Sequence, residues 1–177
     1  MSKFVIDADG LIKLGKARIL GALVESHEVL IPEAVYEEAV VSGKRELYED
    51  AFELERLLGD EGLPITRSSL EPQADRMLEG VTSLGGGERN TLHLYFTEKA
   101  DAVLSDDRVF LNFLGRNSVP FVAPVNVVVT LTGSGRLSFE DGSKALDRLS
   151  VYVRSEVLER ARIELEDMRK ESEEDSG

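Results

Sequence analysis

The sequence contains no cysteine and only two histidines, His27 and His93. The absence of cysteine excludes a disulfide framework, a thiolate nucleophile and any zinc site built on sulfur. Two isolated histidines are too few for a histidine-rich metal site. No stretch approaches the roughly 18 uncharged apolar residues of a membrane span, and the first residues, MSKFVIDADG, lack the apolar core of a secretory signal. We therefore expect a soluble cytoplasmic protein with no membrane partner.

Basic residues are scarce relative to acidic ones. The chain has 21 lysines and arginines against 34 aspartates and glutamates, for a net charge of −13. Such a surface repels phosphate backbones, which argues against a non-specific nucleic-acid binder. The length of 177 residues and a hydrophobic content of 42% suit one globular domain with a real core.

Short apolar runs alternate with longer segments of helical periodicity. The runs predict strands, at residues 4–6, 29–31, 102–105 and 120–123, with a further edge strand near 63–66. The longer segments predict helices, at residues 9–25, 32–42, 44–58, 72–80, 88–99, 108–114, 140–150 and 155–170. Residues 125–132 are apolar and β-branched, and their pattern suits a helix and a strand equally well.

This alternation predicts an α/β fold in which helices cover both faces of a central parallel sheet. We see no internal repeat and no linker long enough to separate domains. We expect one domain over residues 1–150. A C-terminal helix and a frayed acidic tail, residues 151–177, are expected to pack on that domain.

Acidic residues follow two of the predicted strands directly. Asp7 follows the first strand, and Asp106 and Asp107 follow the third. Ligands of open parallel sheets bind beyond the carboxyl ends of the strands, and clustered carboxylates repel one another unless a cation lies between them. A cation site is therefore one interpretation. A helix N-cap is the other, and Asp9 suits a cap for the first helix.

Two glutamates belong to the same argument. Glu38 lies three residues after Val35 in a helix that begins at Pro32, so Val35 and Glu38 share a helix face. Glu88 opens a helix after three glycines, where the helix dipole alone favours a carboxylate. The glycines lack the spacing of a phosphate-binding P-loop.

Four segments in this order, the apolar strand ending in Asp7, IPEAVYEE, GGGERNTLHLY and AVLSDDRVFLNFL, resemble the PIN domain, the nuclease fold of VapC-type toxins. The resemblance covers about residues 3–150. It implies a three-layer α/β/α fold with a central parallel sheet, Mg²⁺ or Mn²⁺ as cofactor, and cleavage of single-stranded RNA. It also implies a homodimer and, for toxin members, an antitoxin partner.

The resemblance assigns roles to individual residues. It implies catalytic acids, at Asp7, Glu38, Glu88 and Asp107. The metal ligands would be Asp7, Glu88 and Asp107, with Asp106 as a neighbour able to share the role. Ser105 precedes the last pair of acids. Asp9 departs from the pattern, because many members carry a small polar residue there, and it adds a carboxylate near the site.

The expected chemistry is metal-assisted hydrolysis of a phosphodiester bond. Glu38 is the candidate to orient or deprotonate the attacking water, or to hold a second ion. Local cations are candidates to bind the RNA despite the overall charge, namely Lys13, Arg89 and Arg108.

Two alternatives stay open. The segment FVIDADG is similar to the first motif of haloacid-dehalogenase-type phosphatases, with Asp7 as nucleophile and Asp9 as acid/base, although Leu11 follows where that motif continues with threonine. A non-catalytic binding module with the PIN fold is the other alternative.

Overall fold

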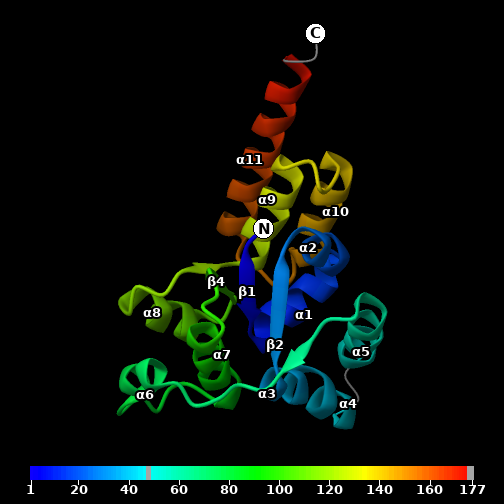
Figure 1. Ribbon diagram of the computed structural model, residues 1–177. Coiled ribbons are helices and arrows are strands. Elements are labelled where there is room, and N and C mark those ends of the chain that lie inside the picture. Colours follow the sequence, from blue (N-terminus) through cyan, green and yellow to red (C-terminus); the bar gives the residue numbers. More distant parts are fainter. Residues whose placement is uncertain (47–48, 175–177) are drawn as a thin grey trace.

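The computed structural model describes residues 1–46 and 49–174 (Figure 1). Its centre is a five-stranded parallel sheet in the order β3-β2-β1-β4-β5. The strands are β1 (Lys3–Ile6), β2 (Glu28–Pro32), β3 (Ile65–Thr66), β4 (Ala102–Leu104) and β5 (Phe121–Val122). All five lie at or within two residues of the predicted runs.

Helices connect the strands and continue after the last one. They are α1 (Ala8–Ala17), α2 (Leu20–Ser26), α3 (Glu33–Tyr36), the π-helix η1 (Glu37–Ser42), α4 (Gly43–Arg45), α5 (Glu49–Glu61), α6 (Pro72–Leu78), α7 (Gly86–Thr97), α8 (Arg108–Arg116), α9 (Pro124–Gly133), α10 (Phe139–Leu149) and α11 (Ser155–Glu174). The segment whose pattern suited helix and strand equally is thus the helix α9.

The core lies on both faces of the sheet, because successive strand side chains point to opposite faces. On one face the strand residues Val5, Leu30 and Val103 pack against α7 and α8. On the other face Ile6 and Leu104 belong to a larger cluster that includes α1, α2, α5, α9, α10 and α11. The predicted three-layer α/β/α fold with a central parallel sheet is confirmed.

Two of the predicted helices are broken. The segment 9–25 divides at Arg18, whose backbone is left-handed (φ 59°) and whose N–H donates to the carbonyls of Gly15 and Leu14, which ends α1. The segment 32–42 changes from α3 into the wider π-helix η1. In the predicted helix 44–58, Leu47 lies outside the described residues, and α5 begins at Glu49.

The C-terminal helix α11 packs on α9 and α10. Its buried side chains Leu158, Ala161 and Leu165 join the larger core cluster. In Figure 1 the C-terminal end of α11 points away from α3 and α4, which lie at the opposite end of the molecule. Helix α11 thus extends the fold away from the edge of the sheet where the predicted acids lie.

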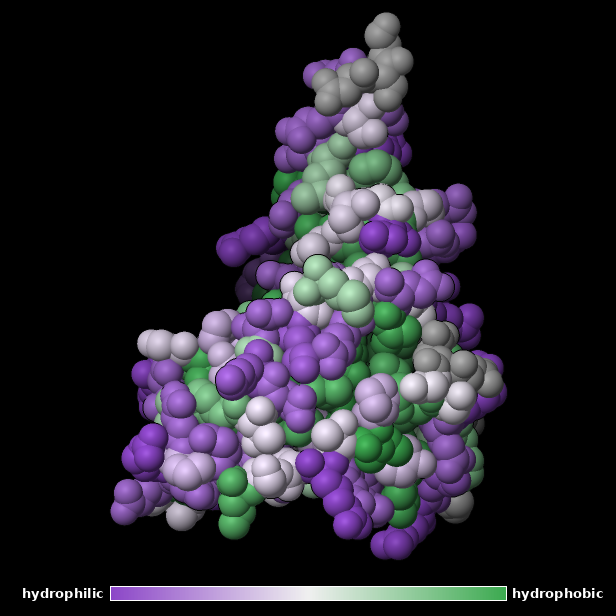
Figure 2. Space-filling view, in the orientation of Figure 1, coloured by the Kyte–Doolittle hydropathy of each residue, from purple (hydrophilic) through white to green (hydrophobic). Residues whose placement is uncertain are grey.

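Much of the visible surface is hydrophilic (Figure 2). Hydrophilic side chains cover much of the face shown in Figure 2, including the part that α11 occupies. Among the described residues, no helix is long and apolar enough to cross a membrane.

Candidate active site

The carboxyl ends of three neighbouring strands bring the predicted acids to one edge of the sheet. Strands β2, β1 and β4 are adjacent, and each is followed at once by the start of an acid-bearing segment. Asp7 follows β1, Asp106 and Asp107 follow β4, and Glu38 lies on η1 beyond β2. Glu88 comes from the first turn of α7, which packs against β1, β2 and β4.

Asp7 is the most deeply buried acid of this group, at 2% exposure. One carboxylate oxygen accepts a hydrogen bond from the backbone N–H of Gly10 at 2.7 Å, and the other accepts from the hydroxyl of Ser105. Burial raises the pKa of Asp7 to about 7, the two hydrogen bonds oppose that rise, and the charges of Asp9 and Glu88 add to it. This carboxylate is therefore harder to ionise than an ordinary aspartate.

Residue 10 must be a glycine because the space beside Asp7 and β4 does not admit a side chain. A Cβ atom there would lie 2.7 Å from the carbonyl oxygen of Leu104 and 3.0 Å from the Asp7 carboxylate. The missing side chain lets the first turn of α1 approach β4, so that the Gly10 N–H reaches Asp7. Gly10 is a supporting residue that motif reasoning missed, although a glycine in the first turn of a predicted helix was a usable signal.

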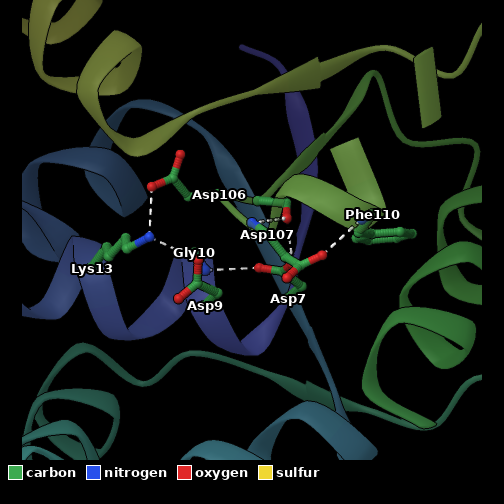
Figure 3. A network of polar contacts seen from close by, with 8 residues as sticks. Asp7, Asp9, Gly10, Lys13, Asp106, Asp107 and Phe110 are labelled. Atoms are coloured by element: carbon green, nitrogen blue, oxygen red, sulfur yellow. Dashed lines mark hydrogen bonds and ion pairs between the residues drawn. The ribbon is translucent and has the colours of Figure 1, made fainter. Parts of the chain in front are cut away.

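Ser105 connects Asp7 to the next strand. Its hydroxyl donates to Asp7 and accepts a hydrogen bond from the backbone N–H of Asp107 at 3.2 Å. The Asp107 carboxylate accepts from the N–H of Phe110 at 2.7 Å and caps α8, as Asp7 caps α1 (Figure 3). The N-cap interpretation therefore holds for both aspartates, and the Ser105 hydroxyl hydrogen-bonds to both of these capping residues. The prediction of Asp9 as a cap is wrong, because Asp9 lies within α1.

Lys13 lies between two other acids. Its ammonium group is 2.8 Å from a carboxylate oxygen of Asp9 and 2.6 Å from one of Asp106, and its side chain is 14% exposed (Figure 3). Burial lowers the pKa of Lys13, but the bonds to Asp106 and Asp9 outweigh it and leave the pKa raised. Asp106 therefore already has a cationic partner.

Glu38, on η1, lies against Gly87 in the first turn of α7, next to Glu88. The pKa of Glu38 is raised by its surroundings, which desolvate the carboxylate, and by the charge of Glu88. A side chain on Gly87 would overlap the Glu38 carboxylate, so the glycine before Glu88 makes room for Glu38. Glu38 also lies on a π-helix, a rare geometry that occurs frequently at functional sites.

The predicted RNA-binding cations have different surroundings. Arg89 donates hydrogen bonds to the carbonyl of Leu84, at 3.1 Å, and to that of Val81, and so fastens the loop before α7. Arg108 is exposed at the first position of α8. Lys13 is the one of the three that contacts the acids. An RNA-binding role for each stays a prediction.

The donor atoms suit a divalent cation, although their arrangement is not a closed coordination shell. Among residues 1–46, 51–59 and 62–174, no group of three or more histidine and acidic side chains is placed to hold one metal ion. Carboxylate oxygens are nevertheless the ligands that Mg²⁺ and Mn²⁺ prefer, and Glu88 raises the pKa of both Asp7 and Glu38. A cation near these three side chains would relieve that repulsion, so the residues fit the cofactor chemically.

Comparisons with known proteins address the family directly. Neither the comparison with curated proteins nor the comparison with solved structures found a match. A family model described as PIN domain, DUF3368, matches residues 3–167. PIN domains are generally nucleases and typically use divalent metal ions. Since the match covers nearly the whole chain, from β1 to within α11, this protein belongs to the PIN-domain family.

Proposed function

We propose that the protein is a metal-dependent endoribonuclease that hydrolyses phosphodiester bonds of single-stranded RNA. The observation that carries the proposal is the environment of Asp7. A carboxylate that is 2% exposed, has its pKa raised to about 7 and feels the charges of Asp9 and Glu88 is a costly arrangement for a purely structural group. Membership of a nuclease family supports the same conclusion.

Asp7, Glu88 and Asp107 are the proposed ligands of Mg²⁺ or Mn²⁺. When bound, the ion supplies positive charge for the reacting phosphate and lowers the pKa of a water molecule. Hydrogen bonds from Gly10 and Ser105 hold the Asp7 carboxylate in one orientation, so this ligand needs little reorganisation.

Glu38 is the proposed proton acceptor for the attacking water. Desolvation and the charge of Glu88 raise its pKa, which brings it closer to the operating range of a general base. The position of Glu38 depends on Gly87, since any side chain at residue 87 would overlap its carboxylate. The proton passes from the water to a Glu38 oxygen as the water oxygen bonds to phosphorus. The bond from phosphorus to the leaving ribose oxygen breaks, and that oxygen takes up a proton from solvent.

The phosphatase alternative explains this site less well. The first motif of those enzymes continues with threonine, whereas Leu11 follows Gly10 in this chain. That mechanism also gives no role to Glu38 or Glu88. Membership of the PIN-domain family argues against it as well.

The proposed partners follow from the family resemblance. We propose that the protein forms a homodimer and acts as the VapC-like toxin of a toxin–antitoxin pair. Light scattering on the purified protein tests the dimer. Growth arrest on expression, relieved by a small protein encoded next to its gene, tests the toxin role.

Cleavage of defined RNA tests the central proposal. A labelled single-stranded RNA incubated with the protein and Mn²⁺ or Mg²⁺ should yield internal cuts, which EDTA abolishes. A matched duplex and a single-stranded DNA of the same sequence are the controls, and both should be cut more slowly. RNA binding without metal-dependent cleavage would favour a binding module, and a phosphorylated Asp7 would favour a phosphatase.

A further inference from the structure

Lys13 occupies the position that a cation takes between two carboxylates. Its ammonium nitrogen is 2.8 Å from Asp9 and 2.6 Å from Asp106. Asp9 is four residues earlier on α1, but Asp106 comes from the segment after β4, so the lysine joins two elements at the sheet edge (Figure 3). With its side chain 14% exposed, Lys13 is enclosed among these groups and does not extend into solvent.

The two sides of the acidic site therefore differ in what balances their charge. Among the described residues, Asp7, Glu38 and Glu88 have no ion pair with a lysine or arginine. Asp9 and Asp106 share one ammonium group. The chain thus supplies a cation to the second side of the site and, in its described part, none to the first.

We propose that the Lys13 ammonium takes the place of a second divalent cation, so that the site binds one metal ion and Asp106 is not among its ligands. The inference rests on the proposed metal dependence. It makes Lys13 a positioning residue that holds Asp9 and Asp106 away from the ion, instead of a residue that binds RNA. It also selects Asp107 over Asp106 as the ligand contributed after β4.

Counting bound Mn²⁺ by titration calorimetry tests this without any measurement of cleavage. The wild type should bind one ion per chain. Lys13→Met keeps much of the length of the side chain and removes the charge, so Asp9 and Asp106 become free to bind a second Mn²⁺. The double variant Lys13→Met/Asp106→Asn should return to one ion, because the second pair of carboxylates is broken.

The matched control is Lys144→Met. Lys144 also pairs with an acid four residues earlier, Glu140 at 2.6 Å, but on the exposed surface of α10. This variant should bind Mn²⁺ as the wild type does. Lys13→Arg keeps the positive charge and should also bind one ion. This variant distinguishes the effect of losing the charge from other effects of replacing the lysine.

A thermal melt in EDTA gives a second readout. Lys13→Met should unfold at a lower temperature than Lys144→Met, because it leaves two partly buried carboxylates facing each other. Saturating Mn²⁺ should raise the melting temperature of Lys13→Met more than that of the wild type. If Lys13→Met does not fold, Lys13→Gln and Lys13→Arg provide the same comparison.

The outcomes separate this inference from the proposed function. Two ions bound to the wild type, or one ion bound to both the wild type and Lys13→Met, would overturn the role of Lys13 and leave metal dependence intact. No ion on the wild type but one on Lys13→Met would overturn the single-ion site and the proposed metal dependence together. No binding to either protein would overturn both.

Discussion

Acidic residues are paired with basic ones differently at the acidic edge of the sheet and in the helical layer at the other end of the molecule. On α10 and α11, acids and bases alternate on exposed faces and pair locally, as Lys144 does with Glu140 and Arg169 with Glu173. At the sheet edge, acids from separate elements lie together and are partly buried, and Lys13 pairs with Asp9 and Asp106.

The difference distinguishes charges that stabilise the folded state from charges that destabilise it. Exposed pairs within one helix each contribute about 0.3–0.5 kcal/mol and are easily replaced. The buried Asp7 raises the free energy of the folded state when it is ionised, and no lysine or arginine in the described part of the chain pairs with it. The buried Asp7 carboxylate destabilises the folded state, yet several elements of the fold combine to place it, which points to a function. Removing its charge should therefore stabilise the metal-free protein.

The largest expected effect is on the pH dependence of stability. The folded-state pKa of Asp7, about 7, lies above the ordinary value of 3.8, so the folded protein binds this proton more tightly than the unfolded chain. This stabilisation is complete below about pH 4 and is lost as the pH rises through about 7. A difference of roughly three pH units corresponds to at most about 4 kcal/mol.

Asp7→Asn cannot ionise, so in EDTA at about pH 8 it should be more stable than the wild type by up to that amount. Urea denaturation of both proteins across this pH range measures the difference. Asp167→Asn, on the exposed surface of α11, is the control and should keep the wild-type slope. A less stable Asp7→Asn protein would show that Asp7 serves mainly as a structural cap.

The next effect is on cleavage. Glu88→Gln removes the charge that acts on both Asp7 and Glu38 and should lower the rate of RNA cleavage by at least about 100-fold. The control is Glu79→Gln, an exposed glutamate at the end of α6, which should cleave like the wild type. Undiminished cleavage by Glu88→Gln would indicate a contaminating nuclease or a different site.

A smaller effect should distinguish Glu38 from the rest of the site. Gly87→Ala pushes against the flexible end of the Glu38 side chain, whereas a Cβ on Gly86 meets nothing within 4 Å. Gly87→Ala should therefore cleave about tenfold more slowly at nearly unchanged stability. This is less than the roughly 100-fold or more expected when a general base is lost, because Glu38 is displaced and not removed. Gly86→Ala is the matched control. Equal rates for the two variants would remove Glu38 from the mechanism.

Much of this arrangement could be predicted from the sequence because it depends on local patterns. Apolar runs marked the strands, and Asp7 and Asp107 follow them directly, so their place at the sheet edge needed only the rule for parallel sheets. The position of Glu38 followed from its helical spacing. The break at Arg18 could not be predicted, because the residue with the left-handed backbone there is not the glycine that usually marks such a helix end.

The partners of the charged residues were harder to predict than their positions. The spacing of Asp9 and Lys13 was consistent with an ion pair, but the bond from Lys13 to Asp106 joins residues 93 positions apart. Gly87 lies on α7 and Glu38 on η1, so their contact likewise depends on tertiary packing. Such contacts decide which acids carry uncompensated charge, and only the folded structure shows them.

The smallest expected effect is that of salt, and it tests whether the site differs from the rest of an acidic surface. With a net charge of −13, the metal-free protein should melt about 2–4 °C higher in about 1 M KCl than at low salt, which corresponds to about 1 kcal/mol, because screening reduces self-repulsion. Asp7→Asn should show a shallower rise, since one of its uncompensated charges is gone. Glu164→Gln removes one negative charge from the exposed surface of α11. It tests whether the repulsion comes from the whole surface or from the edge of the sheet. If it flattens the salt dependence as much as Asp7→Asn does, the repulsion belongs to the whole surface. If it leaves the wild-type slope, the repulsion is concentrated at the edge of the sheet.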